Sequence, residues 1–123
     1  MIPDSVQLGR FRFHVSYRHL RGDEGLCIRV LGPVDGNEEE LLRYDCFKQE
    51  PHFHTEVFGK NTITPITSDH PVGWTLEQLR TSLAELVVQS GGDQLDGEET
   101  SRIVDAVDQL AIAAKGAYKA SRE

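Results

Sequence analysis

The residues best able to do chemistry lie close together near the middle of the chain. Asp45 is followed, after a short gap, by His52 and His54. A β-strand projects residues i and i+2 to the same side, so an extended segment here would place His52, His54 and Glu56 on one face. Two imidazoles that close can share a metal ion, share a proton or hold an anion. This segment is therefore the candidate functional site.

Three interpretations of the histidine pair are open. In the first, both histidines lie at the surface of an edge strand and have no special role. In the second, they bind a divalent metal, for which imidazole is a suitable ligand, and Glu56, Asp45 or His70 completes the ligand set. No cofactor is required by the sequence, and a divalent metal is compatible with it.

In the third interpretation, the site is a metal-free catalytic or anion-binding site. Histidine titrates near neutral pH, so His52 and His54 would divide the acid and base roles of a phosphoryl transfer. Asp45 would orient one imidazole, and Arg43 would neutralise a phosphate. Residues 43 and 45 are two positions apart on the preceding strand, so they project to the same face. The strand register that would bring them to the histidines is not set by the sequence.

The elements that must position these residues follow from the spacing of apolar residues. Alternation in the first half predicts an antiparallel sheet of about four strands over residues 8–58, the last one running from His52 to Phe58. Residues 59–73 are rich in turn-forming residues and are expected to form a loop. Two helices are expected near residues 75–90 and 97–120. This order predicts a single α+β domain spanning residues 1–123.

Capping signals and apolar stripes refine the two helices. Thr75 is expected to cap the first, with Trp74 as the hydrophobic staple, and Glu99 to act as the reciprocal cap of the second. Leu83 and Val107 lie in the middle of the apolar stripes and are expected to be buried. The stripe expected on the second helix contains Ile103, Val104, Val107, Leu110, Ala111, Ala114 and Tyr118.

Composition and charge limit the partners. The 123 residues carry a net charge of −7, which disfavours sequence-independent binding to nucleic acid. Apolar runs are too short for a membrane span and the N-terminus lacks a signal pattern, so a cytoplasmic location without membrane contact is expected. Cys27 and Cys46 are expected to be free thiols in the core.

The order of three blocks resembles the TumE-type proteins, small bacterial chains encoded in toxin–antitoxin pairs. The blocks are Arg43-Tyr44-Asp45, His52-Phe53-His54 and residues 74–79. The resemblance implies a growth-inhibiting toxin held in check by an antitoxin partner. Three features depart from the pattern: Cys46 stands where asparagine is expected, the loop from residue 54 to 74 is long, and the second helix is an addition.

Two functional hypotheses follow. The first is a toxin-like enzyme acting on RNA or a nucleotide through His52, His54, Asp45 and Arg43. The second is a non-catalytic acidic interaction protein, such as an antitoxin, immunity protein or phage inhibitor, whose helical half binds a protein partner. A homodimer is compatible with either hypothesis. The charge favours the second hypothesis, and the clustered histidines favour the first.

Overall fold

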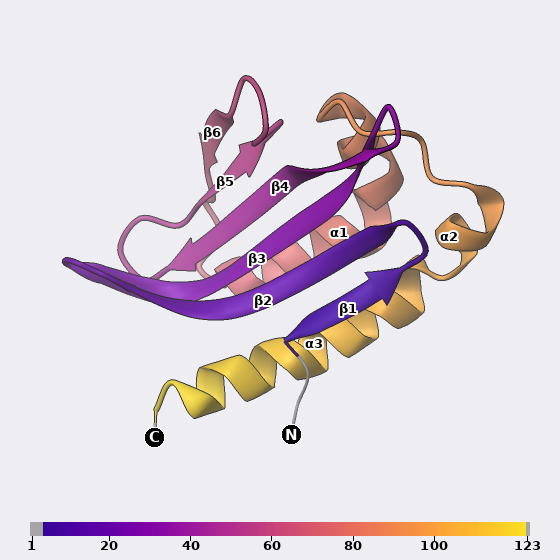
Figure 1. The fold of residues 1–123 in the computed structure, drawn as a ribbon. Helices are drawn as coiled ribbons and strands as arrows, with labels where there is room; N and C mark the ends of the chain where they lie inside the picture. The colour runs from indigo at the N-terminus through magenta and orange to yellow at the C-terminus, as the bar shows by residue number, and fades with distance from the viewer. Residues whose placement is uncertain (1–3, 123) are drawn as a thin grey trace.

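The computed structural model describes residues 4–122 and confirms the α+β class, with an antiparallel sheet packed against C-terminal helices (Figure 1). The strands are β1 (Ser5–Leu8), β2 (Phe11–Leu20), β3 (Asp23–Val34), β4 (Asn37–Phe47), β5 (His52–Thr55) and β6 (Thr62–Pro65). The helices are α1 (Pro71–Gln89), α2 (Gly97–Ser101) and α3 (Ile103–Ala120). None of these helices is both long and apolar enough to cross a membrane.

The sheet is a simple meander in which each strand pairs with the next one along the chain. Two residues, Asp35 and Gly36, connect β3 to β4, and both have positive φ angles, of 50° and 84°. Two consecutive left-handed residues form the mirror-image turn whose twist suits a hairpin, and Asp-Gly is a favoured pair for it. The turn is therefore limited to the two residues between Val34 and Asn37.

The expected number of strands was too low, because the sheet has six strands rather than about four. The additional strands β1 and β6 each contain only four residues. All four residues of β6 are exposed, so this edge strand leaves no alternating apolar pattern, and the sequence predicts a loop there. Strand β5 ends at Thr55 rather than Phe58, because Glu56 adopts a left-handed conformation with φ of 48° and begins a turn.

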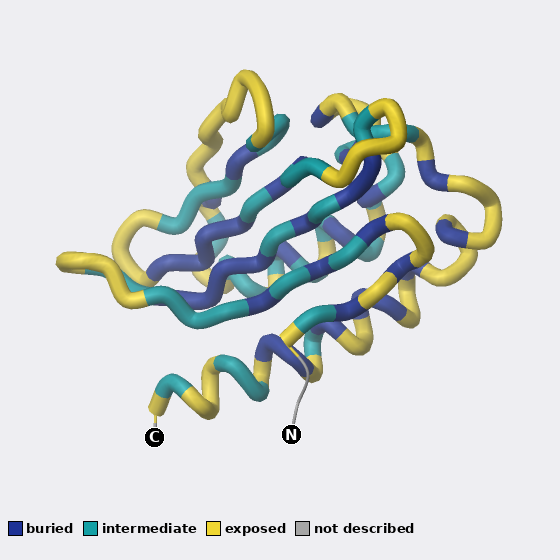
Figure 2. Tube along the Cα trace, in the orientation of Figure 1, coloured by how far each residue is buried: buried dark blue, intermediate teal, exposed yellow. Residues whose placement is uncertain are grey.

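The two faces of the sheet differ sharply in character. On one face, Phe13, Ile28, Leu42 and Tyr44 are buried in the core cluster, which also contains residues of α1 and α3. Figure 2 shows buried segments both on the central strands and on the helices behind them. No helix covers the opposite face in Figure 1, and the side chains that alternate with this core project from it. The cysteines divide between the faces: Cys46 joins the core cluster and Cys27 faces the other way. Both are buried free thiols, as expected, but only Cys46 belongs to the core cluster.

Helix α1 begins at Pro71, four residues before the expected start, with His70 in the N-cap position. Thr75 is not the cap: it is buried within the helix, and its hydroxyl lies 3.5 Å from the Cys46 sulfur. Trp74 packs against the ring of Tyr44 instead of acting as a staple. Pro71 favours a helix start at its own position, because the first helical residue does not need its N–H as a donor. This signal competes with the capping pattern at Thr75.

The second helical region is divided at Arg102, whose φ and ψ of −105° and 4° interrupt the helix. The expected Asp96–Glu99 capping box is present, but it caps the short helix α2. Three expected members of the α3 stripe are not buried: Val104 is 52% exposed, Tyr118 is 45% exposed, and Ala111 is only partly buried. The buried residues of α3 are Ile103, Ala106, Val107, Leu110, Ala113 and Ala114.

Glu99 joins the helical layer to the sheet. Its carboxylate accepts hydrogen bonds from the backbone N–H of Asp96 at 2.9 Å and of Arg10 at 2.7 Å. The Arg10 guanidinium adds an ion pair at 2.8 Å. Burial alone would raise the pKa of Glu99, but these donors outweigh burial and hold the pKa at about 2. The β1–β2 turn is thereby tied to α2.

Truncation of the core should test the helix packing. Leu83 and Val107 are 1% and 0% exposed, which confirms that both are buried. We expect Leu83→Ala to lower the free energy of unfolding by about 2–5 kcal/mol, through lost apolar burial and a residual cavity. Urea denaturation measures this loss. A change below about half a kcal/mol, typical of an exposed position, would contradict this packing.

The Glu99 contacts should make stability depend on pH. A carboxyl whose pKa is depressed in the folded state contributes stability above its unfolded pKa and loses it as pH falls through the folded value. We therefore expect unfolding experiments between about pH 4.5 and pH 2 to show a loss that Glu99→Gln removes, on the order of 3 kcal/mol. The exposed neighbour provides the control: if Glu98→Gln flattened the profile equally, Glu99 would not be its source.

Candidate functional site

The register of the strands brings the candidate residues together on the helix-free face. One row across the sheet contains Cys27, Asp45 and His52 on β3, β4 and β5. The adjacent row contains Arg43 and His54 on β4 and β5. The parity argument from the sequence is confirmed, because both histidines project to the same side as Asp45.

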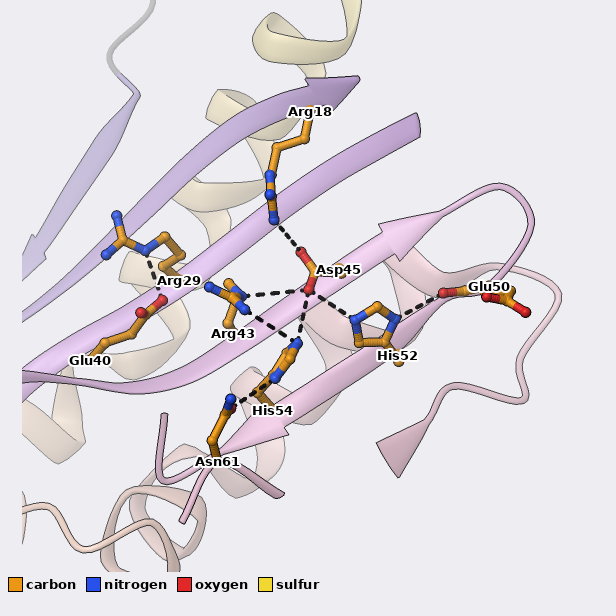
Figure 3. Close-up of polar contacts among 9 residues, drawn as sticks. All are labelled: Arg18, Arg29, Glu40, Arg43, Asp45, Glu50, His52, His54 and Asn61. Atoms are coloured by element: carbon orange, nitrogen blue, oxygen red, sulfur yellow. Dashed lines mark hydrogen bonds and ion pairs between the residues drawn. The ribbon is translucent and has the colours of Figure 1, made fainter. Parts of the chain in front are cut away.

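Asp45 is the centre of the cluster (Figure 3). Its side chain is only 2% exposed, and one oxygen, Oδ2, lies 3.1 Å from Nε2 of both His52 and His54. Nε of Arg43 lies 3.5 Å from the same oxygen, and Nη1 of Arg18 lies 3.5 Å from Oδ1. A buried carboxylate is costly unless it is paired, and here four nitrogen-bearing side chains surround it.

The proton positions on His52 follow from its two partners. Nδ1 lies 2.9 Å from the backbone carbonyl oxygen of Glu50, which only accepts hydrogen bonds, so Nδ1 carries a hydrogen. Nε2 faces the Asp45 carboxylate, which when ionised is also only an acceptor. Both contacts are satisfied together when each nitrogen of His52 donates. Its side chain is 26% exposed, so solvent reaches it.

His54 lies deeper, with 6% of its side chain exposed. Its Nδ1 lies 2.9 Å from Oδ1 of Asn61, and its Nε2 lies 3.4 Å from Nη2 of Arg43. Nε2 also lies 3.1 Å from Oδ2 of Asp45, and an ionised carboxylate only accepts, so in this shorter contact Nε2 carries the hydrogen. His54 therefore acts as a buried donor to Asp45, with Arg43 alongside it. The interpretation of both histidines as surface residues was wrong for His54.

Two contributors were not recognised from the sequence. Arg18 on β2 reaches Asp45 across Gly25, its cross-strand partner, which has no side chain to intervene. A Cβ atom on Gly25 would lie 2.2 Å from the Cys46 carbonyl oxygen. Asn61 follows the turn after β5 and has a φ of 50°, an angle that asparagine tolerates better than most residues. The turn-forming Gly59-Lys60-Asn61 sequence was the only available signal for Asn61.

Cys27 lies next to Asp45 but is unsuited to act as a nucleophile. Burial, followed by the adjacent Asp45 charge and its hydrogen bond, raises the pKa of the Cys27 thiol to about 12. The reactive form of cysteine is the thiolate, which is therefore scarce at neutral pH. Cys27 fills space beneath the cluster.

Two expected metal ligands are not part of the cluster. Glu56 follows the end of β5 in a left-handed conformation, and its carboxylate lies over Gly59. His70 is exposed at the start of α1. Within residues 4–122, the group able to hold a metal consists of Asp45, His52 and His54, whose donor atoms lie within 4.8 Å of one another.

Charge favours an anion over a metal ion at this group. Arg18 and Arg43 already oppose the single negative charge of Asp45. Two unit charges 4 Å apart interact by about 4 kcal/mol at an effective dielectric constant of 20, so each guanidinium would oppose a divalent cation by roughly twice that amount. The same excess of positive charge would attract a phosphate or carboxylate.

Removing the central carboxylate should expose the dependence of the fold on this cluster. Asp45→Asn leaves Arg18 and Arg43 without their counter-charge, and we expect the free energy of unfolding to fall by about 3–5 kcal/mol. Chemical denaturation of this variant and of Asp105→Asn, which alters an exposed carboxylate on α3, makes the comparison. Equal stability of the two variants would show that the ion pairs contribute nothing to folding.

Comparison with known proteins identifies the family of the chain but does not indicate an activity. No curated protein and no solved structure matches the chain. A family model described as a domain of unknown function, DUF7700, matches residues 5–114, which include the whole sheet, the Asp45 cluster and most of α3. The chain therefore belongs to the DUF7700 family.

Proposed function

We propose that the Asp45 cluster binds a phosphate group of RNA or of a nucleotide and promotes phosphoryl transfer, in a toxin-like protein of the TumE type. The observation that carries the proposal is the convergence of Arg18, Arg43 and His52 on one buried carboxylate at a sheet face without helices. The cluster holds more cationic groups than its single anion neutralises. Such a site is complementary to an oxyanion.

The proposed roles follow from exposure and hydrogen bonding. Arg18 and Arg43 are 39% and 27% exposed, so both guanidinium groups can contact a phosphate from solvent. His52 is the accessible imidazolium and is assigned as the general acid. Asp45 orients it, and the buried His54 donates a hydrogen bond that fixes Asp45. This assignment replaces the expected division of acid and base roles between the two histidines.

The reaction would proceed by displacement at phosphorus. An attacking hydroxyl or water oxygen forms the new phosphorus–oxygen bond and loses its proton to solvent. The leaving oxygen departs with the electrons of the broken bond and takes the Nδ1 proton of His52, whose hydrogen bond to the Glu50 carbonyl oxygen is given up in this step. General acid catalysis of this kind contributes typically 10²–10⁴-fold to a rate.

A second candidate function rests on α3. Its outer face exposes Val104 and Ile112, which are 52% and 61% accessible, close to the acidic side chains of Asp105 and Asp108. Apolar residues surrounded by charge are typical of protein-binding surfaces. In this alternative the protein is a non-catalytic interaction module, and α3 binds an antitoxin or target protein with basic groups around an apolar patch.

Variants in the Asp45 cluster and on α3 distinguish between the two proposed functions. We expect His52→Gln and Arg43→Gln to weaken binding of a short oligoribonucleotide roughly tenfold or more, since each loses a charge-assisted hydrogen bond worth about 1.5–3 kcal/mol. Both should also abolish growth inhibition when expressed in a bacterial host. His19→Gln, an exposed histidine outside the cluster, should change neither property.

The opposite pattern would favour the interaction module. If Val104→Glu and Ile112→Glu removed growth inhibition while His52→Gln and Arg43→Gln retained it, the proposed catalytic role would be wrong. Thermal denaturation of each variant distinguishes loss of function from loss of fold.

A further inference from the structure

A row of basic side chains continues from the Asp45 cluster across the helix-free face. Arg43 on β4 is the direct cross-strand partner of Arg29 on β3, and Arg29 is the direct partner of His14 on β2. Residues directly opposite one another in an antiparallel pair lie on the same face, so the row lies on the face that carries Asp45. In Figure 3, Arg43 lies between Arg29 and His52.

The pairing of two arginines is unfavourable for the sheet by itself. Like charges directly opposite one another on neighbouring strands destabilise the pairing. Acidic groups reduce this cost: Glu40 lies 2.8 Å from Nε of Arg29, and Asp45 lies 3.5 Å from Nε of Arg43. The two guanidinium groups nevertheless remain neighbours. Departures from a local rule of this kind are expected at functional sites.

Arg29 keeps hydrogen-bond donors that are available to a ligand. Among the residues that the structure describes, its guanidinium donates to Glu40, and it does so through Nε. The two terminal nitrogens, which carry most of the N–H donors of a guanidinium, point away from Glu40 in Figure 3. The side chain is 37% exposed, which is close to the 39% of Arg18 in the cluster. Solvent, and therefore an anion, reaches Arg29.

The spacing of the row suits a phosphodiester chain. Neighbouring strands lie about 4.7–4.9 Å apart, so the backbone positions of Arg29 and Arg43 are separated by one strand spacing. Consecutive phosphates of a nucleic acid strand are separated by a sugar, whereas those of a nucleoside diphosphate share one bridging oxygen. Two long side chains from adjacent strands therefore match the phosphates of a strand without having to converge on one point.

We propose that Arg29 binds the phosphate next to the one held at the Asp45 cluster, so that the ligand is a single-stranded oligoribonucleotide lying across β4 and β3. The inference rests on the proposed phosphate site and narrows its ligand to a chain with at least two phosphates. His14 extends the row towards β1. The net charge of −7 opposes long-range attraction of such a chain, so these local contacts supply the affinity.

Ligands with one and two phosphates test the role of Arg29. Calorimetric titrations would compare uridine monophosphate, the 5′-phosphorylated dinucleotide pUpU and uridine diphosphate. We expect the wild-type protein to bind pUpU ten or more times tighter than either other ligand. Arg29→Gln should remove that preference and leave the affinity for uridine monophosphate unchanged, whereas Arg43→Gln should weaken the binding of both. Because one phosphate contact of a single strand is lost, Arg29→Gln should also reduce the salt dependence of pUpU binding, log K against log salt concentration, by about 0.7.

Two further variants keep the test informative. Arg102→Gln removes an exposed arginine that pairs with Glu98 outside the sheet, and it should retain the preference for pUpU. The double variant Arg29→Gln/Glu40→Gln leaves no unpaired acid behind and should lose the preference as Arg29→Gln does. If the wild-type protein binds uridine monophosphate but does not prefer pUpU, or if the double variant keeps the preference, the role of Arg29 is wrong and the phosphate site stands. Failure to bind any of the three ligands would overturn the phosphate site as well.

Discussion

The buried carboxylate of Asp45 is the constraint around which the helix-free face is organised. With 2% of its side chain exposed, it has too little water around it to remain charged without partners. The protein supplies those partners from three strands: Arg18 from β2, Arg43 from β4, and the histidines from β5. Each contact depends on a fixed strand register, so charge satisfaction and strand alignment support each other.

The fold explains how such a cluster lies next to an apolar core without disturbing it. Successive residues of a strand project to opposite faces. Tyr44 therefore packs under Trp74 in the core, while Asp45, one residue later, meets the cationic side chains. Helices α1 and α3 cover only the apolar face, as Figure 1 shows, and the Glu99–Arg10 ion pair secures the connection between α2 and the sheet.

Local patterns in the sequence predicted much of this arrangement. Alternation in residues 10–17 and the apolar spacing around Leu83 and Val107 identified buried faces, because burial on one side leaves a periodic signal. The short, wholly exposed β6 leaves no such signal, and the proline at residue 71 competed with the capping pattern at Thr75. Strand existence was therefore more predictable than the sheet edges and helix starts.

The sequence predicted where the candidate site lies, but it predicted only some of the residues that form it. The i, i+2 spacing placed His52 and His54 on one face, and the shared parity of Arg43 and Asp45 offered their partners. Arg18 could not be assigned, because its contact with Asp45 depends on the pairing of β2 with β3 and on the absence of a side chain at Gly25. Glu56 was misplaced because one left-handed residue ended the strand.

The central claim is that the cluster is an anion site whose accessible acid is His52. The most direct measurement is side-chain ¹⁵N NMR of the imidazole and guanidinium groups during titration with inorganic phosphate. The account predicts saturable shifts at His52, Arg18 and Arg43, an imidazolium spectrum for His52, and no shift at His19. Absence of saturable shifts at these groups, or a His52 ring whose Nε2 is unprotonated and binds Zn²⁺ in preference to phosphate, would contradict it.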